Sequence, residues 1–140
     1  MRLRFQFDTE AIHWETVVAI LKASGMAHYS NVMHQKAFTN SHTVVFAFDG
    51  EMMIGCGRAI SDGVYQAAIY DLAVLPAYQG KGVGKLVLKQ LIDRNSGCNF
   101  ILYASPGKEL FYEKLGFRRL KSGLALFLNQ DTMQAKGFIE

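Results

Sequence analysis

A glycine-rich run has the residue types and spacing best suited to chemistry in this sequence, and it reads Gln79-Gly80-Lys81-Gly82-Val83-Gly84-Lys85. It lies between a predicted strand and a predicted helix, where backbone N–H groups lack partners and the helix dipole adds positive potential. A phosphate or pyrophosphate is the natural ligand of such a place. The alternative is a flexible turn without a ligand, which we disfavour because closely spaced glycines weaken a helix start.

The order of residues in this run does not match two other phosphate-binding motifs. A P-loop needs a glycine five positions before Gly84 and a Ser or Thr after Lys85, but Gln79 and Leu86 stand there. A dinucleotide fingerprint that starts at Gly80 needs its third glycine where Lys85 stands.

The elements around the run follow from the periodicity of apolar residues. Two helices are predicted first, one that begins after Asp8 or Thr9 and one at 31–38. Another follows the run at 82–94, and a short one is predicted at 108–115. Strands are predicted at 3–7, 43–48, 52–60, 65–75, 100–104 and 124–128.

The order of these elements predicts the fold class. Asp49-Gly50 and Asp62-Gly63 are hairpin turns and make the central strands antiparallel, and Arg58 and Asp62, which flank the second turn, are expected to form a structural pair. The strand, helix and strand from 65 to 104 predict a right-handed crossover with parallel strands. We therefore expect an α/β fold with a mixed sheet of about seven strands and helices on both faces, in a single domain at 1–140.

Composition excludes several classes of protein. The 140 residues are 50% hydrophobic and 19% charged, which is typical of one folded domain. No apolar run approaches the roughly 20 residues of a membrane span. The net charge of +3 is scattered, so we expect no nucleic-acid partner and no membrane partner. Two cysteines and four histidines without ligand spacing predict no metal site, and the cysteine usage predicts a cytoplasmic protein.

Two motifs at a characteristic spacing resemble the GNAT superfamily of N-acetyltransferases. Residues 79–84 match its pattern Q/R-x-x-G-x-G/A, after Asp71-Leu72-Ala73-Val74-Leu75-Pro76, which looks like the strand that leads into that loop. Phe111-Tyr112-Glu113-Lys114-Leu115-Gly116-Phe117 resembles the second signature of the family. The resemblance covers about residues 43–128 and implies a seven-stranded mixed fold and acetyl-CoA as co-substrate, without a metal.

The resemblance also implies roles for individual residues. Backbone groups of the strand would pair with the pantetheine arm, and those of the loop would hold the pyrophosphate. Ser105 and Lys108 stand where many members carry Asn and Ala. Ser105 is expected to hydrogen-bond the coenzyme through its hydroxyl, and Lys108 either reaches a coenzyme phosphate or is simply solvated. The implied coenzyme-binding residues are Leu72, Ala73, Val74, Gln79, Gly80, Lys81, Gly82, Val83, Gly84, Lys85, Ser105 and Lys108.

Two residues are candidates for proton transfer. An amine must lose a proton before it attacks a thioester, because alkylamines have pKa values of about 10. Asp71 is the candidate base or amine anchor, with a salt bridge or a cap as the structural alternative. Tyr112 would donate a proton to the departing thiolate, with packing on the sheet as the alternative. A backbone N–H near Val74 would stabilise the oxyanion.

The predicted function is an acetyl-CoA-dependent N-acetyltransferase that acts on a primary amine of a small molecule, by direct attack in a ternary complex. His28, Tyr29 and Tyr70 are the candidate substrate-binding residues, with packing of the loop as the alternative for His28 and Tyr29. The alternatives are a protein or peptide N-acetyltransferase and a non-catalytic coenzyme A binding module. A homodimer is possible, since members of the family often dimerise.

Overall fold

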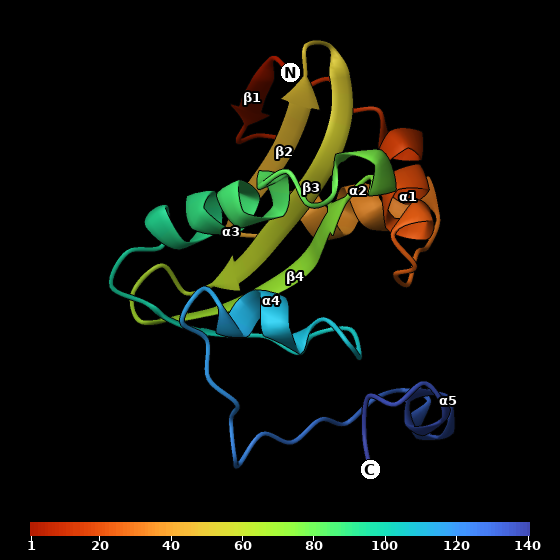
Figure 1. Ribbon diagram of the computed structural model, residues 1–140, viewed down its shortest axis with the longest axis vertical. Coiled ribbons are helices and arrows are strands. Elements are labelled where there is room, and N and C mark those ends of the chain that lie inside the picture. Colours follow the sequence, from red (N-terminus) through yellow and green to blue (C-terminus); the bar gives the residue numbers. More distant parts are fainter. The chain divides into compact units, whose positions relative to one another are not determined.

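The computed structural model describes all residues from 1 to 140. They form two compact units, Met1–Leu102 and Tyr103–Glu140. The first unit contains the sheet and the three longest helices, and the second contains two short helices (Figure 1). None of the helices is both long and apolar enough to cross a bilayer.

The first unit is built on a five-stranded mixed sheet in the order β1-β2-β3-β4-β5. The first three pairings are antiparallel, and β4 pairs with β5 in parallel. This confirms the predicted meander and the parallel strands on either side of a helix. The strands are β1 (Leu3–Gln6), β2 (Thr43–Asp49), β3 (Met52–Ser61), β4 (Gln66–Val74) and β5 (Asn99–Ile101).

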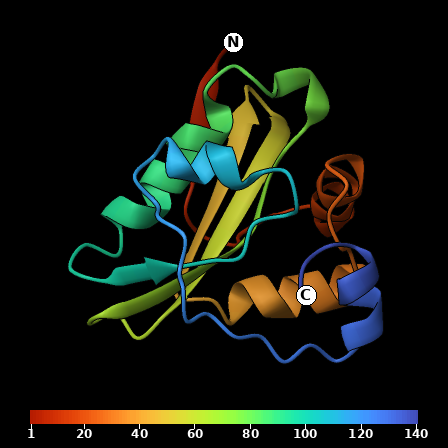
Figure 2. The same ribbon diagram turned by 60° about the horizontal axis from the view of Figure 1, so that its bottom comes forward.

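Helices cover both faces of this sheet, as expected. Helices α1 (Trp14–Ala23) and α2 (Asn31–Thr39) lie on one face and α3 (Val83–Asp93) lies on the other (Figures 1 and 2). Strand β2 is therefore buried along nearly its whole length, because both of its faces are covered.

Aromatic rings and a glycine set the packing on the two faces. The rings of Trp14, Phe38 and Phe46 lie 5.5 to 6.0 Å apart at their centroids, beneath α1 and α2. On the other face, a Cβ at Gly57 would lie 3.1 Å from both Val87 and Leu91 of α3. The small residue on β3 lets α3 approach the sheet closely.

Two local predictions in the first unit are wrong. Helix α1 begins after His13 rather than after Asp8 or Thr9, because the Asp8 carboxylate accepts hydrogen bonds from Gln6 and from the Glu10 N–H in a preceding turn. Asp62 does not pair with Arg58. Its Oδ1 instead accepts three backbone N–H groups within its own turn, which satisfies it locally.

The second unit corrects the predicted number of strands. It contains α4 (Glu109–Glu113) and α5 (Gln130–Ala135) but no strand, so the sheet has five strands rather than about seven. The predicted strand at 124–128 is wrong. Leu124, Leu126 and Leu128 are at least 92% exposed, and the segment has no paired neighbour. An alternating pattern favours a strand only where another strand can supply hydrogen bonds.

Candidate active site

The glycine run forms an open loop with unpaired backbone donors. The 3-10 helix η1 (Pro76–Tyr78) leads from β4 into it, and α3 begins within it, at Val83. Gly80 and Gly82 have φ values of +76° and +85°, which few other residues adopt. A Cβ at either glycine would meet no atom within 4 Å. The N–H groups of residues 80 to 85 have no acceptor in the protein, so the loop has the geometry of an anion site.

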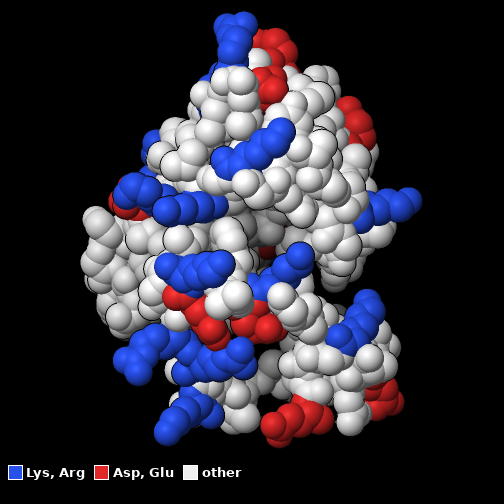
Figure 3. Space-filling view, in the orientation of Figure 1, with Lys and Arg blue, Asp and Glu red and all other residues white.

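Positive charge near this loop comes from individual lysines. Lys81 and Lys85 are exposed, and the Lys81 ammonium lies 5.4 Å from the centroid of the Tyr78 ring. Figure 3 shows Lys and Arg side chains scattered over this face of the molecule, with Asp and Glu side chains among them. No group of three potential metal ligands occurs in the chain. The loop therefore offers local attraction for an anion rather than a broad basic surface.

The edge of β4 next to the loop is open. Strand β5 pairs with β4 only at residues 66–68, so residues 69–74 have no partner strand on that side. The Leu75 N–H donates to the Ile54 carbonyl of β3 at 2.8 Å. Successive N–H groups of a strand point to opposite sides, so the Val74 N–H points to the open edge. An extended ligand could pair there as an added strand does.

A β-bulge interrupts β4 before this open edge. Arg58 of β3 pairs with Tyr70 and Cys56 pairs with Ala73, so two residues of β4 oppose one residue of β3. Asp71, within the bulge, has a φ of +55°, which is uncommon for a residue other than glycine. Backbone strain of this kind is often found at functional sites.

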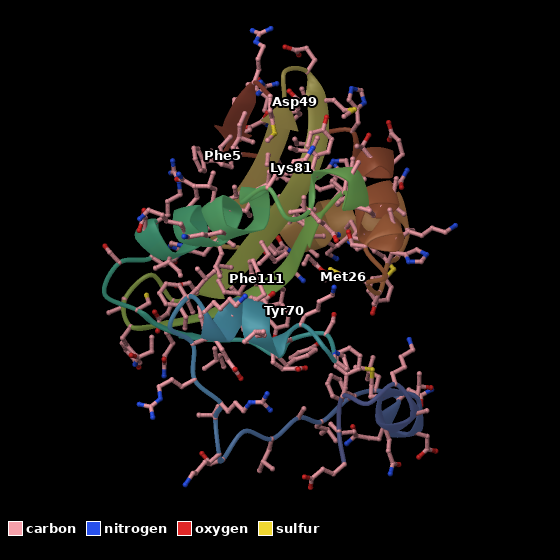
Figure 4. All side chains as sticks on the ribbon, viewed as in Figure 1. Phe5, Met26, Asp49, Tyr70, Lys81 and Phe111 are labelled. Atoms are coloured by element: carbon pink, nitrogen blue, oxygen red, sulfur yellow. The ribbon has the colours of Figure 1, made fainter.

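The bulge brings two neighbouring side chains of β4 to the same arginine. The Arg58 Nε donates to the Asp71 Oδ2 at 2.7 Å, and the guanidinium lies 5.4 Å from the centroid of the Tyr70 ring. Tyr70 is labelled in Figure 4. It also lies 5.6 Å from the Phe38 ring, and its Nη1 donates to Ser41 at 3.2 Å. Regular alternation would place the side chains of adjacent residues on opposite faces.

The salt bridge that we kept as the alternative for Asp71 is therefore present. The Arg58 and Asp71 side chains are only 15% and 20% exposed, so solvent weakens their attraction less than at a fully exposed pair. Oδ1 of Asp71 accepts no hydrogen bond. The Asp71 carbonyl accepts the Cys56 thiol, and burial raises the pKa of that thiol far above its usual range, so Cys56 is no nucleophile.

Sequence reasoning missed His34 on α2. This side chain is buried, and its Nε2 accepts the Tyr29 N–H at 2.8 Å. The neutral ring then carries its proton on Nδ1, an assignment that follows from this bond. Burial lowers the pKa of His34, and the Asp71 carboxylate acts against that shift. Its spacing of four residues from the buried Phe38 could have revealed its position.

The expected substrate-binding residues lie in different environments. His28 and Tyr29 are exposed in the connection between α1 and α2, and the His28 Nδ1 lies 3.3 Å from the Met26 carbonyl. Tyr70 lies on β4 beside Arg58. The Tyr29 ring packs against His34 with centroids 5.7 Å apart, which links this connection to α2.

The second unit holds the candidate acid, Tyr112. Its ring lies edge-on to Phe111 and Phe117, with centroids 5.0 and 5.8 Å away. Burial raises the pKa of its phenol, so the hydroxyl keeps its proton at neutral pH. Lys108 precedes α4 and is exposed, and its N–H donates to the Ser105 carbonyl at 2.9 Å.

Known proteins resemble both the sequence and the fold. Residues 40–119 match the family model described as acetyltransferase (GNAT) domain. The N-acetyltransferase ycf52 of Pyropia yezoensis is 40% identical over 75 residues, which are 51% of this chain and 43% of that protein. The histone acetyltransferase TAP1 of Glycine max is 40% identical over 76 residues, which are 51% of this chain and 32% of that protein. The matched region thus spans less than half of these relatives.

The likeness to a solved structure extends over almost the whole chain. A GNAT-family acetyltransferase from Streptococcus pneumoniae superposes with a TM-score of 0.76 and 24% identity. The likeness covers 91% of this chain and 98% of the other. At this identity it supports the fold alone.

Proposed function

The chain belongs to the GNAT family of acetyltransferases, and we propose that it moves the acetyl group of acetyl-CoA to the primary amine of a small molecule. The observation that carries this proposal is that two backbone surfaces follow each other along the chain. These are the open edge of β4 and the loop at 80–85 with its unpaired N–H groups. A long ligand with a pyrophosphate at one end and amide groups along its arm fits these two surfaces.

The loop and strand would bind the coenzyme through their backbones. The N–H groups of residues 80 to 85 would hold the pyrophosphate, and those of Leu72 and Val74 would pair with the pantetheine arm. The Gln79 N–H, which we also expected to take part, already donates to the Pro76 carbonyl at 3.2 Å. Lys81 and Lys85 would add positive charge. Ser105 and Lys108 are proposed as further contacts from the second unit.

The reaction would proceed by direct attack in a ternary complex. The amine nitrogen attacks the thioester carbonyl, an N–C bond forms and the C–S bond breaks. The Val74 N–H would stabilise the oxyanion, and Tyr112 would protonate the departing thiolate. Asp71 would anchor the amine or accept its proton. Since Oδ2 of Asp71 already accepts from Arg58, Oδ1 is the atom that would face the amine.

A protein or peptide acceptor is the second candidate. It is favoured by one relative of this chain, which is named histone acetyltransferase TAP1. His28, Tyr29 and Tyr70 are proposed to line the acceptor side in either case.

Further parts of the proposal concern organisation and compartment. We propose that residues 1–140 act as one acetyltransferase domain, since the family match spans both compact units. A reducing compartment is favoured because Cys56 and Cys98 are both free thiols. We propose the cytoplasm, although a relative from Arabidopsis thaliana is named chloroplastic.

Release of coenzyme A from acetyl-CoA, detected with a thiol reagent, tests the function. The acceptors are polyamines, arylalkylamines, aminoglycosides, amino acids and lysine-containing peptides, with a control that lacks an acceptor. We expect release above the control with one class of small amine. Release with peptides alone would support the second candidate. Binding of acetyl-CoA without release by any acceptor would indicate a non-catalytic coenzyme A binding module.

A further inference from the structure

Two side chains from distant parts of the first unit converge on one carbonyl at the end of β4. The Gln79 Nε2 donates to the Val74 carbonyl oxygen at 2.8 Å, and the Ser24 hydroxyl donates to the same oxygen at 3.0 Å. Val74 is the last residue of β4, and Gln79 is the first residue of the glycine run. The Gln79 side chain therefore ties the start of the loop to the end of the strand.

The Gln79 amide, unlike the Ser24 hydroxyl, donates to this carbonyl alone. The Ser24 hydroxyl has a single proton and two acceptors, because it also lies 2.7 Å from the Ile20 carbonyl of its own helix. The Gln79 Nε2 has no second acceptor in the protein. Without the Gln79 amide, the only side chain left to donate to the Val74 carbonyl would be the Ser24 hydroxyl. That hydroxyl can donate to the Ile20 carbonyl of α1 instead.

The hydrogen bond from Gln79 to Val74 lies between the two backbone surfaces proposed for the coenzyme. On one side is the open edge of β4, which presents the Val74 N–H. On the other side are the N–H groups of residues 80 to 85. The chain between them is the short η1 helix, so a bond from Gln79 back to Val74 closes this connection and fixes the spacing of the two surfaces. Fixed spacing spares a ligand the entropy of ordering them.

On the basis of the proposed function, we infer that Gln79 is a positioning residue, whose side chain makes the pantetheine surface and the pyrophosphate surface act as one site. The side chain needs only an N–H donor at sufficient reach. Arginine meets that need and methionine, which has a similar length, does not.

Two acetyl donors, acetyl-CoA and acetyl-pantetheine, distinguish the positioning role of Gln79 from a general effect of its substitution on stability. Acetyl-CoA spans both surfaces, whereas acetyl-pantetheine lacks the pyrophosphate and reaches only the strand. For Gln79→Met we expect kcat/KM with acetyl-CoA to fall about 10-fold, the size expected for one lost hydrogen bond. We expect a much smaller fall with acetyl-pantetheine, so the preference for the full coenzyme should shrink. Gln79→Arg should restore the preference.

A matched control removes a hydrogen bond of the same segment that points elsewhere. The Tyr78 hydroxyl donates to the Asp49 Oδ2 at 2.7 Å, so Tyr78→Phe loosens η1 from the hairpin between β2 and β3. This variant should keep the preference for acetyl-CoA over acetyl-pantetheine. Melting temperatures of all variants show how much of any loss is due to folding.

Two outcomes would overturn the inference. One is an unchanged preference in Gln79→Met, which includes an equal fall with acetyl-CoA and acetyl-pantetheine. The other is a loss of preference in Gln79→Arg as large as in Gln79→Met. Calorimetry of the wild-type protein with acetyl-CoA separates this test from the proposed function. If the wild type binds acetyl-CoA and the preference does not change, only the role of Gln79 is lost. If the wild type does not bind it, both are lost.

Discussion

The glycine loop at 79–85 and the bulge in β4 are separated by only a few residues, yet they present different groups. The loop presents backbone N–H groups, and its glycines keep side chains out of the way. The bulge presents the side chains of Tyr70 and Asp71, which meet Arg58 from the neighbouring strand. One region presents atoms that every residue has, and the other presents atoms that only particular residues have.

The two regions therefore differ in how a substitution should act. At the loop, adding a group is harmful, because the site consists of space and unpaired donors. At the bulge, removing a group is harmful, because each charged side chain offsets the desolvation of the other. The predictions below test this difference, in order of expected effect.

The largest effect is expected from Gly82→Asp. Asp is among the residues that tolerate a positive φ, so the fold should persist. Its carboxylate would stand beside the pyrophosphate, and a contact between like charges costs several kcal/mol. We expect a loss of affinity for acetyl-CoA of about 100-fold or more, measured by calorimetry.

Gly82→Asn is the matched control for charge, because the two side chains have nearly the same shape. It should lose far less affinity than Gly82→Asp. Equal losses would mean that shape alone limits the loop, and full retention of affinity by Gly82→Asp would place the pyrophosphate elsewhere.

The second effect concerns Arg58→Met. This variant leaves the Asp71 carboxylate largely buried without its partner, and we expect the free energy of unfolding to fall by about 2–3 kcal/mol. Asp71→Asn in the same chain should recover part of that loss, because it removes the unpaired charge. Urea denaturation of the two single variants and the double variant measures the coupling. Strictly additive losses would show that the pair contributes no specific stability.

The same difference explains what the sequence could predict. Glycine spacing is local, so the loop and α3 could be predicted, and so could the hairpin turns. The bond between Arg58 and Asp71 joins residues 13 positions apart, and it depends on a bulge that strict alternation does not foresee. The segment 124–128 shows the same limit, since its pattern is local but a strand requires a partner.

The third effect concerns Tyr112, which the second motif identified as the candidate acid. Tyr112→Phe should lower turnover by about 10-fold or more, the range for loss of a general acid, with nearly unchanged affinity for acetyl-CoA. Tyr65→Phe, at an exposed tyrosine, is the control. Unchanged turnover in Tyr112→Phe would remove this residue from the mechanism, and its half-buried ring would then serve packing alone.

The smallest effect is a pH dependence of stability, which we expect from His34 and not from the glycine loop. Burial lowers the pKa of His34 below its usual value of 6.5, and the neighbouring Arg58 and His28 act in the same direction while Asp71 opposes them. The unfolded chain therefore binds a proton more readily than the folded protein does. The contribution of His34 to stability is complete above about pH 6.5 and is lost as the pH falls below that value.

Protonation of His34 would also remove the lone pair on Nε2 that accepts the Tyr29 N–H. We expect the melting temperature to fall between pH 6.5 and 5, and His34→Gln, which cannot titrate, should flatten that fall. His13→Gln, at an exposed histidine, should keep it. An unaltered slope in His34→Gln would show that the acidic loss of stability arises from other groups. Because the glycine loop contains no histidine, a flattened slope would locate this pH sensitivity at His34, which accepts from Tyr29 and lies near Arg58 and Asp71.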